Sequence, residues 1–208
     1  MKLKICGVQS LDEIHQLASK KVDLAGLNFI PSSKRCISLR LAKQIVEATD
    51  QSIRLVALFQ NAGIDEVMSI LKQLGGIEYV QLHGDESSAY IKELSGLGYK
   101  VIKSVPISSD TDLAEAEGYI AKHQADLYLL DRVQQGMGDL VNQKVANQLA
   151  AKYKVFLAGG LNVDNLEPAL ENIDQNLYGI DIASGVRDEL KLNLDKLDEI
   201  LQIMEGVS

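Results

Sequence analysis

The sequence predicts an α/β fold in which a single domain, residues 1–208, forms one closed barrel of parallel strands. Eight short apolar runs of strand length recur along the chain, and segments with the 3.6-residue periodicity of amphipathic helices lie between them. Alternating strands and helices predict parallel strands joined by right-handed crossovers. Eight such units followed by a terminal helix favour closure, so the expected architecture is a single-domain TIM (β/α)8 barrel.

The eight runs are rich in leucine, isoleucine and valine, and most end at a glycine or a polar residue. They are LKICG (3–7), DLAGLNF (23–29), RLVALFQ (54–60), YVQLHG (79–84), KVIKSV (100–105), DLYLLD (126–131), KVFLAGG (154–160) and GIDIASG (179–185). Ser10 and Glu13 have the spacing of a capping box and mark the start of the first helical segment. The clearest apolar helix faces comprise Leu11, Ile14, Leu17 and Ala18, then Val67, Ile70, Leu71 and Leu74, then Leu194, Leu197, Ile200, Leu201 and Met204.

An open, doubly wound sheet is the structural alternative to a barrel. No run is followed by the dinucleotide fingerprint G-x-G-x-x-G, and no linker or second domain is visible. The barrel is therefore the preferred prediction.

The overall composition excludes several classes of partner. A formal net charge of −8 argues against nucleic acid, because phosphate backbones require a positive surface. The apolar runs are too short to span a bilayer, so no membrane partner is expected. The N-terminal segment MKLKICGVQS lacks the apolar stretch of a secretory signal, which indicates a cytoplasmic protein. Cys6 and Cys36 have no metal-ligand spacing, so we expect two free thiols and no metal.

Polar, thiol-bearing and glycine residues gather where the predicted strands end. In a (β/α)8 barrel the active site lies at the carboxyl ends of the strands. The residues expected there are Cys6-Gly7, Asn28 to Arg35, Gln60-Asn61, His83-Gly84, Asp131, Gly159-Gly160 and Ser184-Gly185. Such a rim predicts an enzyme that acts on a small metabolite.

Cys6 is the candidate general base. Strand alternation places Lys4 and Cys6 on one side of the first strand, with Leu3 and Ile5 on the other. If the apolar pair faces the helices, Lys4 lies beneath the thiol and supports its reactive thiolate form. The alternative is that Cys6 is a small buried apolar residue, as many lone cysteines are.

Asp131 is the candidate general acid. It follows Leu127 and Leu129 on one face of the sixth strand, so it should stand at the mouth of the barrel over an apolar layer. Such a place favours the protonated carboxyl group that an acid catalyst needs. An Asp after a strand is also a common helix cap or turn residue. A cysteine base and an aspartate acid on one rim would form a pair for proton transfer.

Charged residues near the rim suggest further roles. Asp181 lies within the eighth strand, next to the first strand in a closed barrel, where we expect it to pair with Lys4. Arg35 follows the second strand, and its planar fork is suited to a carboxylate. Lys34 is expected in solvent, and Cys36 is expected to have no role.

Glycines after the last two strands predict a phosphate site. Barrels often bind phosphate there through backbone N–H groups, and both Gly159-Gly160 and Ser184-Gly185 are in the right place. Tight turns that require glycine would explain either pair alone. His83 could line the site, whereas His15 and His123 fall on predicted helices and are expected at the surface.

The chain resembles the phosphoribosylanthranilate isomerase family of tryptophan biosynthesis. The motifs that carry the resemblance are KICG (4–7), P-x-S-x-R within PSSKR (31–35), QLHG (81–84), LLD (129–131), AGGLN (158–162) with Asn165, and D-x-x-SG (181–185). They occur in the family's order and span nearly the whole chain.

The resemblance implies a cofactor-free Amadori rearrangement of an aminoaldose to an aminoketose. Cys6 matches the base that removes the proton from ribose C2, and Asp131 matches the acid that protonates the ring oxygen. Arg35 matches the residue that holds the anthranilate carboxylate. The substrate-binding residues are expected to be Arg35, His83, Gly159, Gly160, Asp181, Ser184 and Gly185, with Lys4 in support. The expected partner is a small phosphorylated substrate, and the chain is expected to be a monomer or homodimer.

The chain differs from the family pattern in two loops. Arg132 follows the acid, and Gln135-Gly136-Met137-Gly138 stands where the family commonly has Gly-Gly-Ser/Thr-Gly. After the eighth strand, Arg187 occupies a position that is usually acidic.

Two other functions stay open at this point. One is another phosphosugar isomerase, such as the related histidine-pathway enzyme, which uses acidic residues where this chain has Cys6 and Ser104-Val105. The other is a noncatalytic phosphosugar-binding barrel, which would require neither Cys6 nor Asp131.

Overall fold

A computed structural model of the chain describes residues 1–49, 52–108, 110–132, 143–171, 173 and 176–207. These residues form two compact units. The N-terminal unit comprises Lys4–Lys103 with His123–Asp126, and the C-terminal unit comprises Met1–Leu3, Ser104–Lys122 and Leu127–Ser208. Gln135 and Met137 lie outside the described residues. The expectation that residues 1–208 form one domain stays a prediction.

The strands pair in the order of a closed barrel, β1-β2-β3-β4-β5-β6-β7-β8, which confirms the predicted (β/α)8 fold. They are β1 (Lys2–Cys6), β2 (Leu24–Asn28), β3 (Arg54–Phe59), β4 (Tyr79–Leu82), β5 (Lys100–Ile107), β6 (Leu127–Arg132), β7 (Val155–Leu157) and β8 (Gly179–Ile182). Each coincides with one of the apolar runs. The prediction succeeds because strands buried on both faces are apolar along their whole length.

The helices alternate with the strands along the chain. They are α1 (Leu11–Ser19), α2 (Leu39–Ala48), α3 (Ile64–Leu74), α4 (Ser88–Gly96), α5 (Leu113–His123), α6 (Gln143–Ala150), α7 (Leu166–Leu170) and α8 (Leu194–Val207). Ser10 caps α1 as predicted, because its hydroxyl oxygen accepts a hydrogen bond from the Glu13 N–H at 3.1 Å. The Glu13 carboxylate in turn accepts from the N–H of Gln9 at 3.0 Å.

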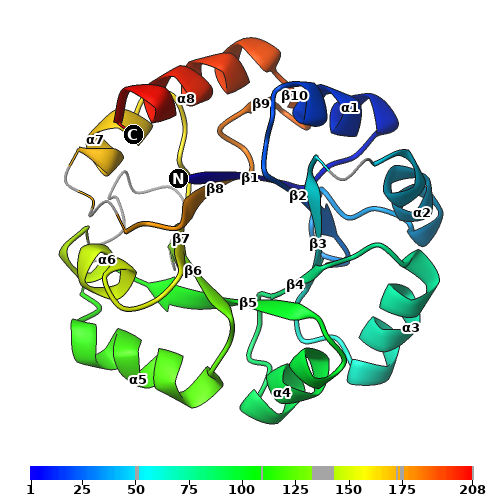
Figure 1. Cartoon of the computed structure of the whole chain (residues 1–208), viewed down its shortest axis with the longest axis horizontal. Helices are drawn as coiled ribbons and strands as arrows, with labels where there is room; N and C mark the ends of the chain where they lie inside the picture. The colour runs from blue at the N-terminus through cyan, green and yellow to red at the C-terminus, as the bar shows by residue number, and fades with distance from the viewer. Residues whose placement is uncertain (50–51, 109, 133–142, 172, 174–175, 208) are drawn as a thin grey trace. The chain divides into compact units, whose positions relative to one another are not determined.

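The N-terminal unit carries the end of β1, from Lys4 on, and then β2, β3 and β4 in chain order. Each of these strands pairs in parallel with the next, and Cys6 at the end of β1 is in register with Gly26 in β2. Helix α2 packs against both α1 and α3 on one side of these strands (Figure 1). The carboxyl ends of the strands therefore share one edge, as the rim prediction requires.

The C-terminal unit carries β6, β7 and β8, which also pair in parallel in chain order. Helices α7 and α8 pack against each other. A short antiparallel hairpin that the sequence analysis did not anticipate, β9 (Arg187–Asp188) with β10 (Lys191–Leu192), precedes α8. The Lys196 ammonium group, within α8, forms an ion pair with Asp188 at 2.6 Å and so fastens the hairpin to that helix.

The buried core is almost entirely aliphatic, with Leu, Ile, Val and Ala from the strands and from one face of each helix. Val67, Leu71 and Leu74 are buried on α3, and Leu197, Ile200 and Met204 on α8, as their spacing predicts. His15 is exposed as expected. The expectation for His123 was wrong: it is only 3% exposed, because it ends α5 on the face that packs inward. No helix in the described ranges is long and apolar enough to cross a membrane.

A glycine in β8 provides a test of how closely the strands pack. A β-carbon at Gly179 would lie 2.7 Å from the Phe156 ring and would also collide with the carbonyl oxygen of Lys2. We expect Gly179→Ala to lower the free energy of unfolding by about 1–3 kcal/mol. The added methyl group would overpack the space beside Phe156 and force the backbone at Lys2 or Gly179 to shift. Urea denaturation followed by far-UV circular dichroism measures the change. Gly118→Ala is the control, since open space surrounds Gly118 in α5 and alanine there should be neutral or stabilising.

Candidate active site

Cys6 ends β1 in a confined position. Cys6 is 6% exposed. Lys4, two residues earlier on the same face of the strand, is fully buried. Cys6 pairs in register with Gly26, where a β-carbon would lie 3.2 Å from the Cys6 Sγ. A side chain at position 26 would therefore press closely on the thiol. Cys6 and Cys36 do not form a disulfide, and Cys36 is exposed.

Arg35 lies against the turn that follows Cys6. Gly7 has a φ of +82°, and a β-carbon there would lie 2.5 Å from the Arg35 Cδ. The two residues come from different loops, yet the side chain of Arg35 crosses the chain directly after Cys6. The structure thus brings together two of the predicted site residues. Lys34, beside Arg35 in the sequence, is exposed as expected.

A buried ion pair that the sequence analysis missed joins the loop after β4 to β5. The Lys103 ammonium group, fully buried, lies 3.1 Å from the Glu86 carboxylate, whose side chain is 2% exposed. Lys103 also donates to the carbonyl oxygens of Leu82 and Gly84. Glu86 in turn accepts from the N–H groups of Gly84 and Asn61. The pair therefore ties the segments that follow β3 and β4 to the middle of β5.

His83 lies within the segment that this ion pair holds. It is half-buried, and its backbone N–H donates to the backbone carbonyl of Phe59 at 2.9 Å. Nearby, the Tyr90 hydroxyl donates to the Ala62 carbonyl at 3.2 Å, and burial raises the pKa of Tyr90 to about 12, with the Glu86 charge as the next cause. Tyr90 is therefore a neutral donor at ordinary pH. The backbone bond of His83 to Phe59 and the bonds of Gly84 to Glu86 fix the backbone at His83 and directly after it.

Asp131 lies near the end of β6 and is half-buried. Leu127 and Leu129 on the same face are 3% and 1% exposed, which confirms the apolar layer beneath it. Asp131 belongs to the C-terminal unit and Cys6 to the N-terminal unit, so their action as a pair stays a prediction. The same holds for Lys4 and Asp181, which is 9% exposed in β8.

The glycine loops after β7 and β8 lie against each other. A β-carbon at Gly185 would lie 2.9 Å from the Asn162 Cα and would collide with the Leu161 carbonyl oxygen. Gly159 and Gly160 have φ values of +90° and +77°, so the turn itself also requires glycine. The Asn165 side chain donates to the Gly160 carbonyl at 3.0 Å and accepts from the Asn162 N–H at 2.9 Å. The structure therefore assembles the predicted phosphate loops into one surface, with Gly160 and Ser184 exposed.

Two further buried polar residues lie in or near the apolar runs: Gln81, within the fourth run, was not singled out from the sequence, whereas Arg187 follows the eighth run and was noted there. Gln81 is 1% exposed, and its amide oxygen accepts no hydrogen bond from the part of the chain that the structure describes. Arg187, at the position that departs from the family pattern, is 4% exposed and donates to the Leu190 carbonyl at 2.9 Å, closing its own hairpin. In the sequence, the sign that Gln81 is unusual is an amide side chain within a predicted buried strand. Within the described ranges, no group of three or more His, Cys, Asp or Glu side chains could hold a metal ion.

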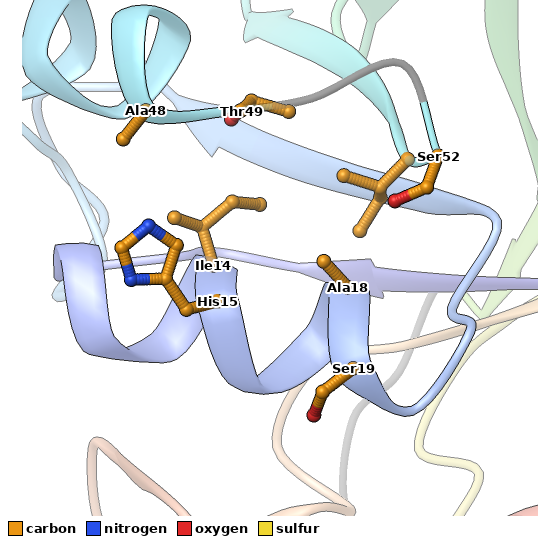
Figure 2. A pocket seen from close by; sticks show the side chains of 8 residues that line it. Ile14, His15, Ala18, Ser19, Ala48, Thr49 and Ser52 are labelled. Atoms are coloured by element: carbon orange, nitrogen blue, oxygen red, sulfur yellow. The ribbon is translucent and has the colours of Figure 1, made fainter.

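A pocket between two helices is separate from these loops. Figure 2 shows it beside the last turns of α1 and α2, where it encloses about 260 Å³. Its lining residues are Ile14, His15, Ala18, Ser19, Ala48, Thr49, Ser52 and Ile53. Because these positions precede the amino ends of β2 and β3, the pocket lies at the opposite end of the strands from Cys6. In barrels that end serves stability.

A family model and a related protein of known name both match this chain over nearly its whole length. A family model for N-(5'phosphoribosyl)anthranilate (PRA) isomerase matches residues 3–203. The N-(5'-phosphoribosyl)anthranilate isomerase of Oceanobacillus iheyensis is 31% identical over 202 residues, which cover 97% of this chain and 95% of that protein.

Solved structures agree with the same assignment. The phosphoribosyl anthranilate isomerase of Thermus thermophilus is 28% identical, with a TM-score of 0.84 and coverage of 100% of both chains. Another phosphoribosyl anthranilate isomerase, in complex with reduced 1-(o-carboxyphenylamino)-1-deoxyribulose 5-phosphate, has a TM-score of 0.84 at 23% identity, and each chain is 99% covered. At that identity the likeness bears on the fold.

Removing one partner of the buried ion pair should be costly. In Glu86→Gln, Lys103 would keep a buried charge without a carboxylate partner, and we expect a loss of about 3–5 kcal/mol in the free energy of unfolding. Glu78→Gln is the matched control, because Glu78 pairs with Lys100 and Arg54 at the surface and should change stability by less than about 1 kcal/mol. Equal effects of the two substitutions in urea denaturation would contradict a special role for the buried pair.

Proposed function

The chain belongs to the N-(5'-phosphoribosyl)anthranilate isomerase family and is an isomerase of tryptophan biosynthesis, and we propose that Cys6 and Asp131 are its general base and general acid. The reaction converts phosphoribosylanthranilate, an aminoaldose, to 1-(2-carboxyphenylamino)-1-deoxyribulose 5-phosphate, an aminoketose. The family assignment decides against the histidine-pathway enzyme and the noncatalytic barrel. The observation that best supports the role of Cys6 is the contact of Arg35, a carboxylate-binding group, with the turn that directly follows Cys6.

Two proton transfers carry the proposed mechanism. Asp131 donates a proton to the ribose ring oxygen while the C1–O bond breaks and the nitrogen lone pair forms the C=N bond, which opens the ring to a protonated Schiff base. The Cys6 thiolate then removes the proton from C2, and the electrons of the C–H bond form the C1–C2 double bond as those of the C=N bond move to nitrogen. The resulting enol becomes the ketone when C1 gains a proton from the Cys6 thiol and the C2 hydroxyl loses its proton to the Asp131 carboxylate, which restores both groups. The buried ammonium group of Lys4 supports this step by stabilising the thiolate.

Binding residues at the two ends of the substrate would hold C2 near the thiol. The Arg35 guanidinium offers paired N–H donors to the anthranilate carboxylate. Backbone N–H groups of the Gly159-Gly160 and Ser184-Gly185 loops would hold the phosphate, since those loops lie together and are partly open to solvent. His83 and Asp181 would line the site between them. No cofactor is needed, because the reaction moves protons within one molecule.

Location and assembly follow from the same proposal. We place the enzyme in the cytoplasm, where a catalytic thiol such as that of Cys6 stays reduced. The chain alone contains every residue of the proposed site, so a monomer would be active, and a homodimer would not need to share residues.

Substitution of the base and the acid tests the proposed roles. Purified protein should convert phosphoribosylanthranilate, and we expect Cys6→Ala and Asp131→Asn each to lower kcat by roughly 10²- to 10⁴-fold, the usual worth of general acid–base catalysis. Fluorescence of the substrate followed over time measures turnover. Cys36→Ala and Asp65→Asn are matched controls on exposed residues and should retain the activity of the unmodified chain. A Cys6→Ala variant with an unchanged rate would refute the base assignment.

The contact between the two glycine loops should govern phosphate affinity. In Gly185→Ala the new methyl group would push the loop after β8 away from Leu161, and we expect inorganic phosphate to bind about tenfold more weakly, as loss of one charge-assisted hydrogen bond would do. Isothermal titration calorimetry measures the dissociation constant. Gly118→Ala, remote from these loops, should bind phosphate as the unmodified chain does. Unchanged affinity in Gly185→Ala would exclude these loops as the phosphate site.

A further inference from the structure

Ser33 occupies the middle of the loop between β2 and α2. Its hydroxyl oxygen accepts two hydrogen bonds, from the Asn28 side-chain amide and from the Arg35 backbone N–H, each 3.1 Å long. A serine oxygen has two acceptor sites, so both are filled. Ser33 therefore joins the last residue of β2 directly to the backbone of Arg35.

The far end of this connection is rigid. Asn28 ends β2 and is only 4% exposed. Its side-chain oxygen accepts from the Ile30 N–H at 2.8 Å, and its carbonyl accepts from the Ile37 N–H at 2.9 Å. Asn28 thus closes both ends of the loop, and its amide orientation is set by two separate bonds. The hydrogen bond from Asn28 to Ser33 therefore fixes the position of Ser33 relative to the buried strand β2.

The near end of the connection is the Arg35 side chain. Among the residues that the structure describes, none accepts a hydrogen bond from its buried Nε. The aliphatic stem is held instead by contact with Gly7, and the Gln9 side chain binds the Lys34 carbonyl at 3.3 Å. Arg35 is therefore held through its backbone and its stem.

We propose that Ser33 is a positioning residue, whose hydrogen bonds to Asn28 and Arg35 hold the guanidinium in the orientation that receives the substrate carboxylate. The proposal rests on the carboxylate-binding role proposed for Arg35. A bidentate bond to a carboxylate requires the guanidinium plane to be aligned, so ordering the residue in advance lowers the cost of binding. Ser33 itself touches neither the reacting carbon nor the two proton-transfer groups.

This role predicts a separation of kinetic constants. An interaction that is equally strong in the ground state and the transition state changes KM and leaves kcat alone. We expect Ser33→Ala to raise KM for phosphoribosylanthranilate about tenfold, the size of one lost hydrogen bond to an ordered group, with kcat within about twofold of the unmodified chain. Ser33→Thr keeps the hydroxyl and should restore KM. Ser32→Ala, on an exposed neighbour, should have no effect.

Binding without turnover separates this proposal from the function itself. Titration calorimetry with the reduced product analogue, which carries the carboxylate, should show about tenfold weaker binding by Ser33→Ala. Inorganic phosphate, which lacks the carboxylate, should bind both proteins equally. In an Arg35→Ala background the Ser33→Ala change should have no further effect on analogue binding, because Ser33 acts through Arg35.

The outcomes distinguish the two ideas. Failure of the unmodified chain to turn over phosphoribosylanthranilate would overturn the proposed function and leave the binding results to judge Ser33. Unchanged analogue affinity in Ser33→Ala, or an equal additional loss in the Arg35→Ala background, would overturn the positioning role. Loss of phosphate binding or of thermal stability in Ser33→Ala would also overturn it, because a general structural effect would then explain the result.

Discussion

Burial of the parallel strands on both faces is the constraint on which the rest of the structure depends. Every residue of β2, β4 and β8 is buried. A strand in that situation has no solvent-facing side where a polar residue could be placed without a partner. Chemically active residues therefore gather at the carboxyl ends of the strands, where the chain leaves the core. Cys6, Asn28 and Asp131 all occupy such positions, each within its strand's last two residues.

Some polar groups are buried in or beside the strands, and their hydrogen bonds fix the loops at the carboxyl ends. Lys103 lies within β5 without exposure, and its charge is balanced by Glu86 from the loop after β4. The carboxylate then accepts two backbone N–H groups, which is how a buried charge becomes tolerable. Asn28 uses its amide in a comparable way to close the loop after β2. In both cases the cost of burying a polar group is offset by fixing a loop beside the candidate site.

Much of the fold was predictable because it follows from local periodicity. The eight apolar runs coincide with the eight barrel strands, and Ser10 begins α1 as its spacing indicates. The position of Arg35 beside the turn after Cys6 was only partly predictable: the rim was expected, but the direct contact was not. The hairpin of β9 and β10 and the burial of His123 were missed, since short pairings and the inward end of an amphipathic helix depend on neighbouring elements.

The sequence by itself determined the order of strands and helices, the aliphatic core and the set of residues at the carboxyl ends, because period and polarity are written along the chain. The ordered motifs also identified the family before any coordinates. Only the tertiary structure decided which of those residues touch. That Gly26 leaves space for the Cys6 thiol, that Gly7 receives the stem of Arg35, and that Ser33 connects Asn28 to Arg35 are contacts between separate segments. Distance along the chain carries no information about such contacts, since packing of the strands creates them.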